Sequence, residues 1–183
     1  MHFDLYRTRR CREHTISRSC KASCSSGFPR VLTAAAALKQ AGFQGSAPKL
    51  QNDEYHQGTD YLEAGRATFE RVYGRGELKV RHRIASFHPL LEDWVVRFGY
   101  GQVLSRPGPE LRERELCAVG ILAGGGQGTE PLLVSHLRGA LRVGASADEI
   151  RAVLDHTECV HGKEAAERAE AVYSVFERSR SLL

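Results

Sequence analysis

Residues 110–143, ELRERELCAVGILAGGGQGTEPLLVSHLRGALRV, consist of two segments with helical periodicity separated by a run of glycines. The first segment ends at Ala123. The second opens at Thr129 with Pro131 close behind, as helix starts commonly do. No Lys-Ser or Lys-Thr pair follows the last glycine and no strand precedes the run, so the glycines do not form a phosphate-binding loop. The pattern predicts two consecutive helices joined by a flexible turn.

Each of these two helices carries one titratable side chain among its apolar positions. At about 100° per residue, Glu115 lies in line with apolar positions of the first helix and His136 with those of the second. The apolar neighbours are Leu111, Ala118, Val119 and Leu122 in the first helix and Leu132, Leu133, Ala140 and Val143 in the second. A carboxyl group and an imidazole that meet inside a core can exchange a proton, so both are candidate catalytic groups. The alternative is structural, with Glu115 paired to a nearby arginine and His136 hydrogen-bonded in the core.

The rest of the chain from residue 51 onward also has helix signals. No segment shows the alternation of a strand or the Asn-Gly turn of a hairpin. Further helices are predicted from a cap at Thr59 or Asp60 to Tyr73, after the capping box at 146–149, and over 163–179. Another helix is predicted to begin at Pro89, with Leu91, Trp94, Val95 and Phe98 facing the core. Gly99 and Gly101 mark the predicted end of the Pro89 helix, with a short continuation to Leu104. The fold class is therefore all-α, a compact bundle of about six helices with short loops.

The first 50 residues differ in composition from the rest. Residues 1–50 hold nine Lys or Arg and two acidic residues, whereas residues 51–183 hold the other 17 Lys or Arg and 20 acidic residues. The segment 1–30 is rich in Arg and Ser and has no apolar core, which is typical of an organellar transit peptide rather than a secretory signal. The alternatives are a disordered tail or an extension upstream of the true start codon. The predicted domains are a basic leader, 1–50, and a helical domain, 51–183.

Composition also limits the partners and the compartment. Because the basic excess lies in the leader, the helical domain has no evident basic patch for nucleic acid. No stretch approaches the roughly 20 apolar residues that span a membrane. The five cysteines form no Cys-x-x-Cys pair, and His156 and His161 lack the i, i+4 spacing of a helical metal pair. We expect no metal and no cofactor, and a mitochondrial location if the leader is a transit peptide, otherwise a cytoplasmic one.

Four short motifs follow one another between residues 99 and 154. They are Ser-Arg-Pro-Gly at 105–108, Arg-Glu-Leu at 114–116, His-Leu-Arg-Gly-Ala at 136–140, and Gly-Ala-Ser followed by Glu-Ile within 144–150. In this order and with this spacing, the segment resembles the carboxymuconolactone decarboxylase family, which shares its helical fold with the alkyl hydroperoxidase D proteins. A weaker similarity extends from about Tyr61 to Phe176 and leaves out the leader.

The resemblance implies an all-α subunit that assembles into a homo-trimer or homo-hexamer, with sites near the subunit contacts. It also implies a decarboxylase that releases carbon dioxide from a small carboxylated muconolactone and returns a proton to the carbanion that is left. On this basis His136 is the candidate proton donor, and Glu115 orients it or relays protons with it. Arg106 and Arg138 are the candidate ligands of substrate carboxylates, with solvated surface or intersubunit salt bridges as their alternative roles.

Two other functions remain open. The hydroperoxidase branch of this fold uses a Cys-x-x-Cys pair just upstream of the histidine, whereas Thr129 and Leu132 occupy those positions here, which opposes a thiol peroxidase of peroxiredoxin type. Cys117 lies on a different helix face from Glu115 and is expected to be inert packing. The segment 155–164 departs from the decarboxylase pattern, which leaves the substrate open and permits a non-catalytic helical oligomer or scaffold.

Overall fold

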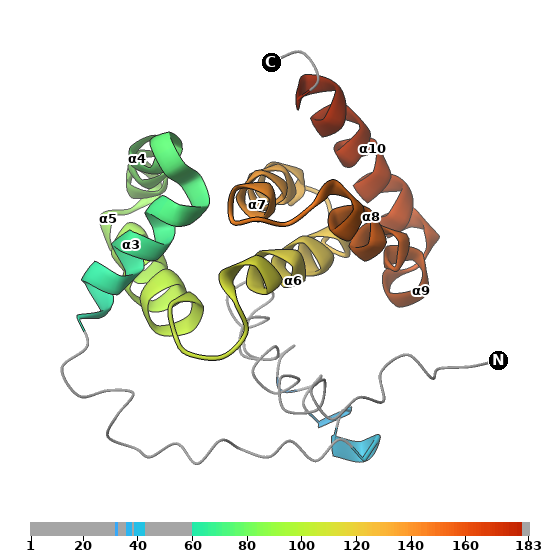
Figure 1. The fold of residues 1–183 in the computed structure, drawn as a ribbon, viewed down its shortest axis with the longest axis horizontal. Helices are drawn as coiled ribbons and strands as arrows, with labels where there is room; N and C mark the ends of the chain where they lie inside the picture. The colour runs from blue at the N-terminus through green and yellow to red at the C-terminus, as the bar shows by residue number, and fades with distance from the viewer. Residues whose placement is uncertain (1–31, 33–35, 38, 43–59, 181–183) are drawn as a thin grey trace.

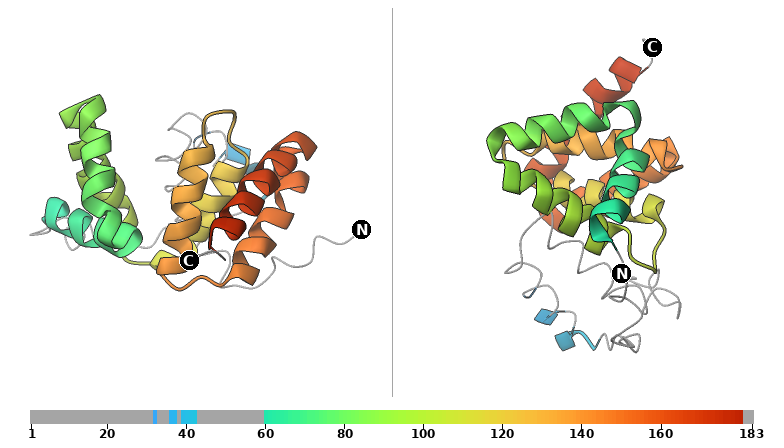
Figure 2. Two further views of the ribbon diagram at one scale, coloured as in Figure 1. Left: turned by 90° about the horizontal axis from the view of Figure 1, so that it is seen from above. Right: turned by 90° about the vertical axis from the view of Figure 1, so that its left-hand side faces the viewer.

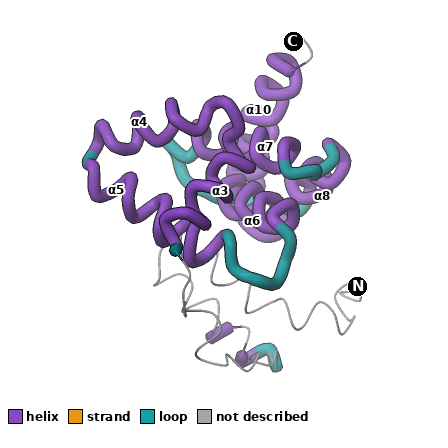
Figure 3. The backbone as a smooth tube through the Cα atoms, turned by 60° about the vertical axis from the view of Figure 1, so that its left-hand side comes forward, coloured by secondary structure: helices purple, strands orange, loops and turns teal. Residues whose placement is uncertain are grey.

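The computed structural model describes residues 32, 36–37, 39–42 and 60–180. Within 60–180 the chain forms helices joined by loops and contains no strand (Figures 1 and 3). The predicted all-α fold class is confirmed. Most of the predicted leader, 1–50, and the start of the predicted helical domain at residue 51 lie outside the described residues. None of the described helices is both long enough and apolar enough to cross a membrane.

The helices of 60–180 fall into two groups that lie side by side (Figures 1 and 2). The first group contains α3 (Tyr61–Tyr73), α4 (Glu77–Phe87), α5 (Pro89–Trp94) and the π-helix η2 (Val95–Leu104). The second group contains α6 (Leu111–Ala123), α7 (Glu130–Arg142), α8 (Ala147–Asp155), α9 (Thr157–His161) and α10 (Lys163–Arg180). A short 3-10 turn, Gly74–Gly76, joins α3 to α4.

All six predicted helices are present. The predicted capping box starts α8: the Ser146 side chain accepts a hydrogen bond from the Glu149 N–H at 3.1 Å, and the Glu149 carboxylate accepts one from the Ser146 N–H at 2.8 Å. Helices α4 and α9 have no clear sequence signal. In helix α4 no residue is fully buried, although Val80 and Ile84 are partly buried against the core, and α9 is only five residues long.

The core consists of two apolar clusters, one in each group of helices. The cluster between α6, α7, α8 and α10 includes Val119, Leu137 and Ile150, which are wholly buried. The cluster of the first group joins α3 to η2 through Phe69 and other buried side chains, and it includes Leu111, the first residue of α6. The start of α6 therefore belongs to the junction between the two groups.

The predicted core face of the Pro89 helix is wrong at three of its four positions, and only Val95 is partly buried against the core. Three side chains predicted to face the core are exposed: Leu91, Trp94 and Phe98, at 38%, 62% and 39%. Val96 and Tyr100 are buried in their place. From Val95 onward the reason is a change of winding, because the chain continues as a π-helix, whereas Leu91 and Trp94 lie in α5, which buries none of its residues. The i→i+5 hydrogen bonds of a π-helix move the buried face away from the positions that an α-helix would bury.

Glycines allow η2 to cross α3 at very short range. Gly99 and Gly101, the predicted end of the helix, lie inside η2 instead. A Cβ atom at Gly101 would lie 2.1 Å from the carbonyl oxygen of Tyr61, and one at Gly65 would lie 2.1 Å from the carbonyl oxygen of Val96. The two backbones therefore touch at a crossing that has no room for a side chain from either helix.

Gly101→Ala is expected to lower the free energy of unfolding by about 3 kcal/mol, because the added methyl group meets backbone that can yield only if the helices separate. Gly99→Ala is the matched control, since a Cβ atom there meets nothing within 4 Å. The control should change stability by less than about 1 kcal/mol. Urea unfolding followed by circular dichroism measures both values. Equal effects of the two substitutions would contradict the close crossing.

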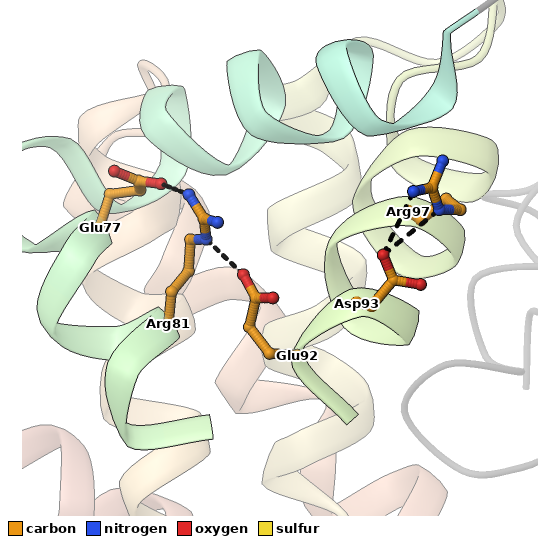
Figure 4. A network of polar contacts seen from close by, with 5 residues as sticks. All are labelled: Glu77, Arg81, Glu92, Asp93 and Arg97. Atoms are coloured by element: carbon orange, nitrogen blue, oxygen red, sulfur yellow. Dashed lines mark hydrogen bonds and ion pairs between the residues drawn. The ribbon is translucent and has the colours of Figure 1, made fainter. Parts of the chain in front are cut away.

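Ion pairs connect α4 to α5 (Figure 4). Arg81 of α4 donates from Nη1 to Glu77 Oε1 at 2.8 Å and from Nε to Glu92 Oε1 of α5 at 2.5 Å. These three side chains are between 16% and 20% exposed. Asp93 and Arg97 form a second, more exposed pair close by. Because neither α4 nor α5 has a buried residue, these charged contacts contribute to holding the two helices together.

Candidate functional site

Glu115 lies in the first half of α6, and its side chain is 0% exposed. The helix begins with a capping box, in which the Glu113 carboxylate accepts a hydrogen bond from the Glu110 N–H at 2.9 Å and so fixes the first turn. Val119 and Leu122, predicted to lie on the same face as Glu115, are buried. A carboxyl group in such surroundings needs a polar partner.

The partner is His136 of α7. Its Nδ1 atom lies 2.8 Å from Oε2 of Glu115, which is a hydrogen-bond distance. Helices α6 and α7 pack side by side after the glycine turn (Figure 1), so the two side chains meet although they are 21 residues apart in the chain. Glu115 thus pairs with a histidine and not with an arginine. The catalytic role of the pair remains a prediction.

The two side chains of the pair differ in their exposure to solvent. Glu115 is wholly buried, and its second oxygen, Oε1, has no hydrogen-bond partner among the residues that the structure describes. The His136 side chain is 16% exposed. A ligand that approaches from solvent therefore meets the His136 ring first, with Glu115 behind it.

Gly139 provides room for the carboxyl group of Glu115. A Cβ atom at Gly139 would lie 2.6 Å from Glu115 Oε2 and 2.8 Å from Val72 Cγ1. The glycine of the His-Leu-Arg-Gly-Ala motif thus lets α3, α6 and α7 meet around this carboxyl group. A larger residue at position 139 would push Glu115 away from His136.

Tyr73 and Tyr100, which no sequence motif singles out, lie in the apolar cluster between α3 and η2. The Tyr100 hydroxyl donates a hydrogen bond to the Tyr73 hydroxyl at 3.0 Å, and the centroids of both rings lie 4.3 Å from that of Phe69. The pKa of Tyr73 is raised: burial raises it most, the hydrogen bond from Tyr100 lowers it, and the negative charge of Glu115 raises it further.

Arg114, next to Glu115 on α6, is a buried arginine that anchors the turn before this helix. It is only 2% exposed. Its Nε atom donates to the carbonyl oxygen of Pro109 at 2.6 Å, Nη1 donates to that of Val103 at 3.0 Å, and Nη2 donates to that of Arg106 at 2.6 Å. The guanidinium group thereby fixes the end of η2 against the start of α6, the helix that carries Glu115.

The two predicted carboxylate-binding arginines lie on different elements. Arg106 is half-buried in the turn before α6, where its carbonyl oxygen accepts the hydrogen bond from Arg114. Arg138 is exposed on α7. Two residues along an α-helix correspond to a rotation of about 200°, so Arg138 leaves α7 on the side away from His136. The structure brings Glu115 and His136 together and does not bring Arg138 to them.

The other features that could hold a ligand or react are cysteines and cavities. Cys117 is half-buried and Cys159 is exposed, and both are free thiols. In the part of the chain that the structure describes, no group of three or more His, Cys, Asp or Glu residues is arranged to hold a metal ion. A cavity of about 10 Å³ lies between α6, α7 and α10, and an open groove of about 570 Å³ lies where α3 leads into α4. Neither is lined by Glu115 or His136.

Comparison with known proteins gives one finding. Residues 89–174 match the model of the Carboxymuconolactone decarboxylase family, whereas no curated protein matches the chain. The matched segment runs from the first residue of α5 into α10, and it contains both Glu115 and His136 but not α3. The predicted resemblance is confirmed over this segment: residues 89–174 are similar to the carboxymuconolactone decarboxylase family.

Proposed function

We propose that this protein is a decarboxylase-like carbon–carbon lyase that acts on a small carboxylated compound of the lactone type. The observation that carries the proposal is the 2.8 Å contact between Nδ1 of His136 and Oε2 of the wholly buried Glu115. The family match over residues 89–174 supports the class of substrate. We propose proton transfer by these side chains alone, with no cofactor.

The proposed reaction needs a single proton donor. Decarboxylation breaks the bond between the substrate carbon and its carboxylate group and releases carbon dioxide. The electron pair of that bond stays on the carbon as a carbanion, or as an enolate where a carbonyl group is adjacent, and this carbon must then take up a proton. Because Nδ1 of His136 faces Glu115, the proton is delivered from Nε2. The Glu115 carboxylate orients the ring and stabilises the imidazolium before transfer.

Arginines complete the proposed site. We propose that Arg106 binds a substrate carboxylate through paired hydrogen bonds. Arg138 points away from His136 within its own chain, so it can contribute only to the site of a neighbouring subunit. This fits the homo-trimer or homo-hexamer that the family resemblance implies. Subunit contacts would cover apolar side chains that the single chain leaves exposed, such as Phe87 and Trp94, at 68% and 62%.

The full chain is expected to release one carbon dioxide per molecule of a carboxylated muconolactone consumed. The same lactone without its carboxylate group serves as the control compound and should be neither consumed nor bound. Carbon dioxide release and substrate loss are measured together, and a thermal shift detects binding even where turnover is slow. A folded protein that neither decarboxylates nor is stabilised by carboxylated lactones would contradict the proposed function.

A further inference from the structure

Val72 of α3 is a wholly buried side chain that lies beside the candidate site. A Cβ atom at Gly139 of α7 would have Oε2 of Glu115 at 2.6 Å and Cγ1 of Val72 at 2.8 Å as its two nearest atoms. The carboxylate oxygen and the valine methyl group therefore share the space over Gly139. The segment that matches the family contains Gly139 and Glu115 but not Val72, and the proposed proton transfer does not use Val72.

The carboxyl group of Glu115 has a hydrogen-bond partner at one of its oxygens and none at the other among the residues that the structure describes. Oε2 lies 2.8 Å from Nδ1 of His136, whereas Oε1 is buried without a partner. The terminal torsion of a glutamate side chain has a broad energy well, so hydrogen bonding at one oxygen leaves room for the carboxyl group to turn. Its orientation toward His136 therefore depends on the apolar atoms packed against it.

Arg142, the last residue of α7, fixes the position of Val72. Its Nη1 atom donates a hydrogen bond to the carbonyl oxygen of Val72 at 2.7 Å. Its side chain also lies against Gly74, the residue that ends α3, where a Cβ atom would meet Nε of Arg142 at 3.0 Å. The end of α3 is thus tied to the helix that carries both His136 and Gly139.

We propose that Val72 is a positioning residue of this site, whose side chain bounds the space beside the Glu115 carboxyl group and keeps Oε2 on Nδ1 of His136. Arg142 holds Val72 in that place. Removal of the valine methyl groups would open a cavity next to the buried carboxyl group, into which it could turn. Val72 acts on the substrate only through Glu115, so its expected effect on turnover rests on the proposed function.

Val72→Ala tests this role. We expect kcat to fall roughly 10-fold, because a displaced Glu115 no longer orients the His136 ring. KM should stay nearly unchanged, since no group that binds the substrate is altered. Val96→Ala is the matched control, because Val96 is a wholly buried valine of the same apolar cluster and is not among the atoms nearest to the Cβ position of Gly139. The control should lose stability but keep kcat. Equal losses of kcat in the two variants, or an unchanged kcat in Val72→Ala, would overturn the inference.

Arg142→Met tests the same role without emptying the core, because it keeps most of the stem and removes the donor to Val72. We expect kcat to fall in the natural chain, whereas Arg142→Met should have no further effect once Val72→Ala is present. The methyl groups that Arg142 holds in place are already absent in that background. A loss of kcat by the same factor in both backgrounds would contradict the role of Arg142.

A measurement without substrate keeps this inference separate from the proposed function. A ring N–H of histidine that donates to a carboxylate gives a proton NMR signal downfield of the amide signals, and the signal of His136 is identified by its loss in His136→Gln. This signal should be broadened or lost in Val72→Ala and kept in Val96→Ala, both measured below their melting transitions. If it is lost in Val72→Ala while the natural chain releases no carbon dioxide, the proposed function fails and the inference stands. An unchanged signal in Val72→Ala overturns the inference whatever the activity.

Discussion

His136→Gln is expected to lower the turnover of a carboxylated muconolactone by a factor of at least about 100, the usual range for losing a general acid. Glutamine is similar in size, and its amide N–H can still donate to Oε2 of Glu115. An amide cannot deliver a proton at neutral pH, however, so return of the proton falls to water. Because protonation completes the reaction, product formation should fall at saturating substrate. Initial rates, with product and carbon dioxide quantified in parallel, measure the effect.

The control for this variant is His82→Gln, because His82 is an exposed histidine of α4. It should keep full turnover and change the free energy of unfolding by less than about 0.5 kcal/mol. Circular dichroism then establishes that His136→Gln is folded under the assay conditions. Normal turnover in folded His136→Gln would remove His136 from the proposed mechanism. The contact with Glu115 would then be a structural interaction inside the bundle.

The contact between Glu115 and His136 could be predicted because it depends on local periodicity alone. Each residue lies on the apolar face of its own helix, and a short glycine turn makes the two helices neighbours. Two consecutive helices with short connections pack through their apolar faces, so polar groups on those faces meet. The same reasoning predicted six helices and the capping box of α8.

The face of the Pro89 helix could not be predicted, because its winding changes along the segment. The prediction took an α-helical rotation of about 100° per residue throughout the segment, which places Trp94 and Phe98 in the core. The π-helical turns of η2 bury Tyr100 instead of Phe98, and Trp94, just before them, is exposed as well. Helix α4 was missed for a different reason: only Val80 and Ile84 are partly buried against the core, and ion pairs also connect the helix to α5, so its periodic signal is weak.

The remaining parts of the candidate site depend on contacts between distant segments. Val72 reaches the region of Glu115 only because α3 packs against α7, more than 60 residues further along the chain. Arg114 departs from the general expectation that a charged residue beside a buried position faces solvent. Its burial depends on the carbonyl groups of a turn that a sequence pattern does not place in space.

Arg114→Leu is expected to destabilise the fold more than any other substitution considered, by about 4 kcal/mol, because it leaves buried carbonyl oxygens of the turn without their donor. Leucine keeps an apolar side chain at this position, so the loss reports the hydrogen bonds rather than an empty space. Arg114→Lys should recover only part of the stability. A single ammonium group cannot match the forked contacts of the guanidinium group with Pro109, Val103 and Arg106. Urea unfolding measures both variants.

Arg112→Leu is the matched control, two residues earlier on the same helix. Arg112 donates to Glu149 of α8 at 2.7 Å, but the two side chains are 39% and 37% exposed, and such exposed ion pairs contribute less than about 1 kcal/mol. The two leucine variants should therefore differ by about 3 kcal/mol in the free energy of unfolding. Equal destabilisation would mean that the prolines hold the turn without Arg114. A large difference would mean that the start of α6, and with it the position of Glu115, depends on one buried guanidinium group.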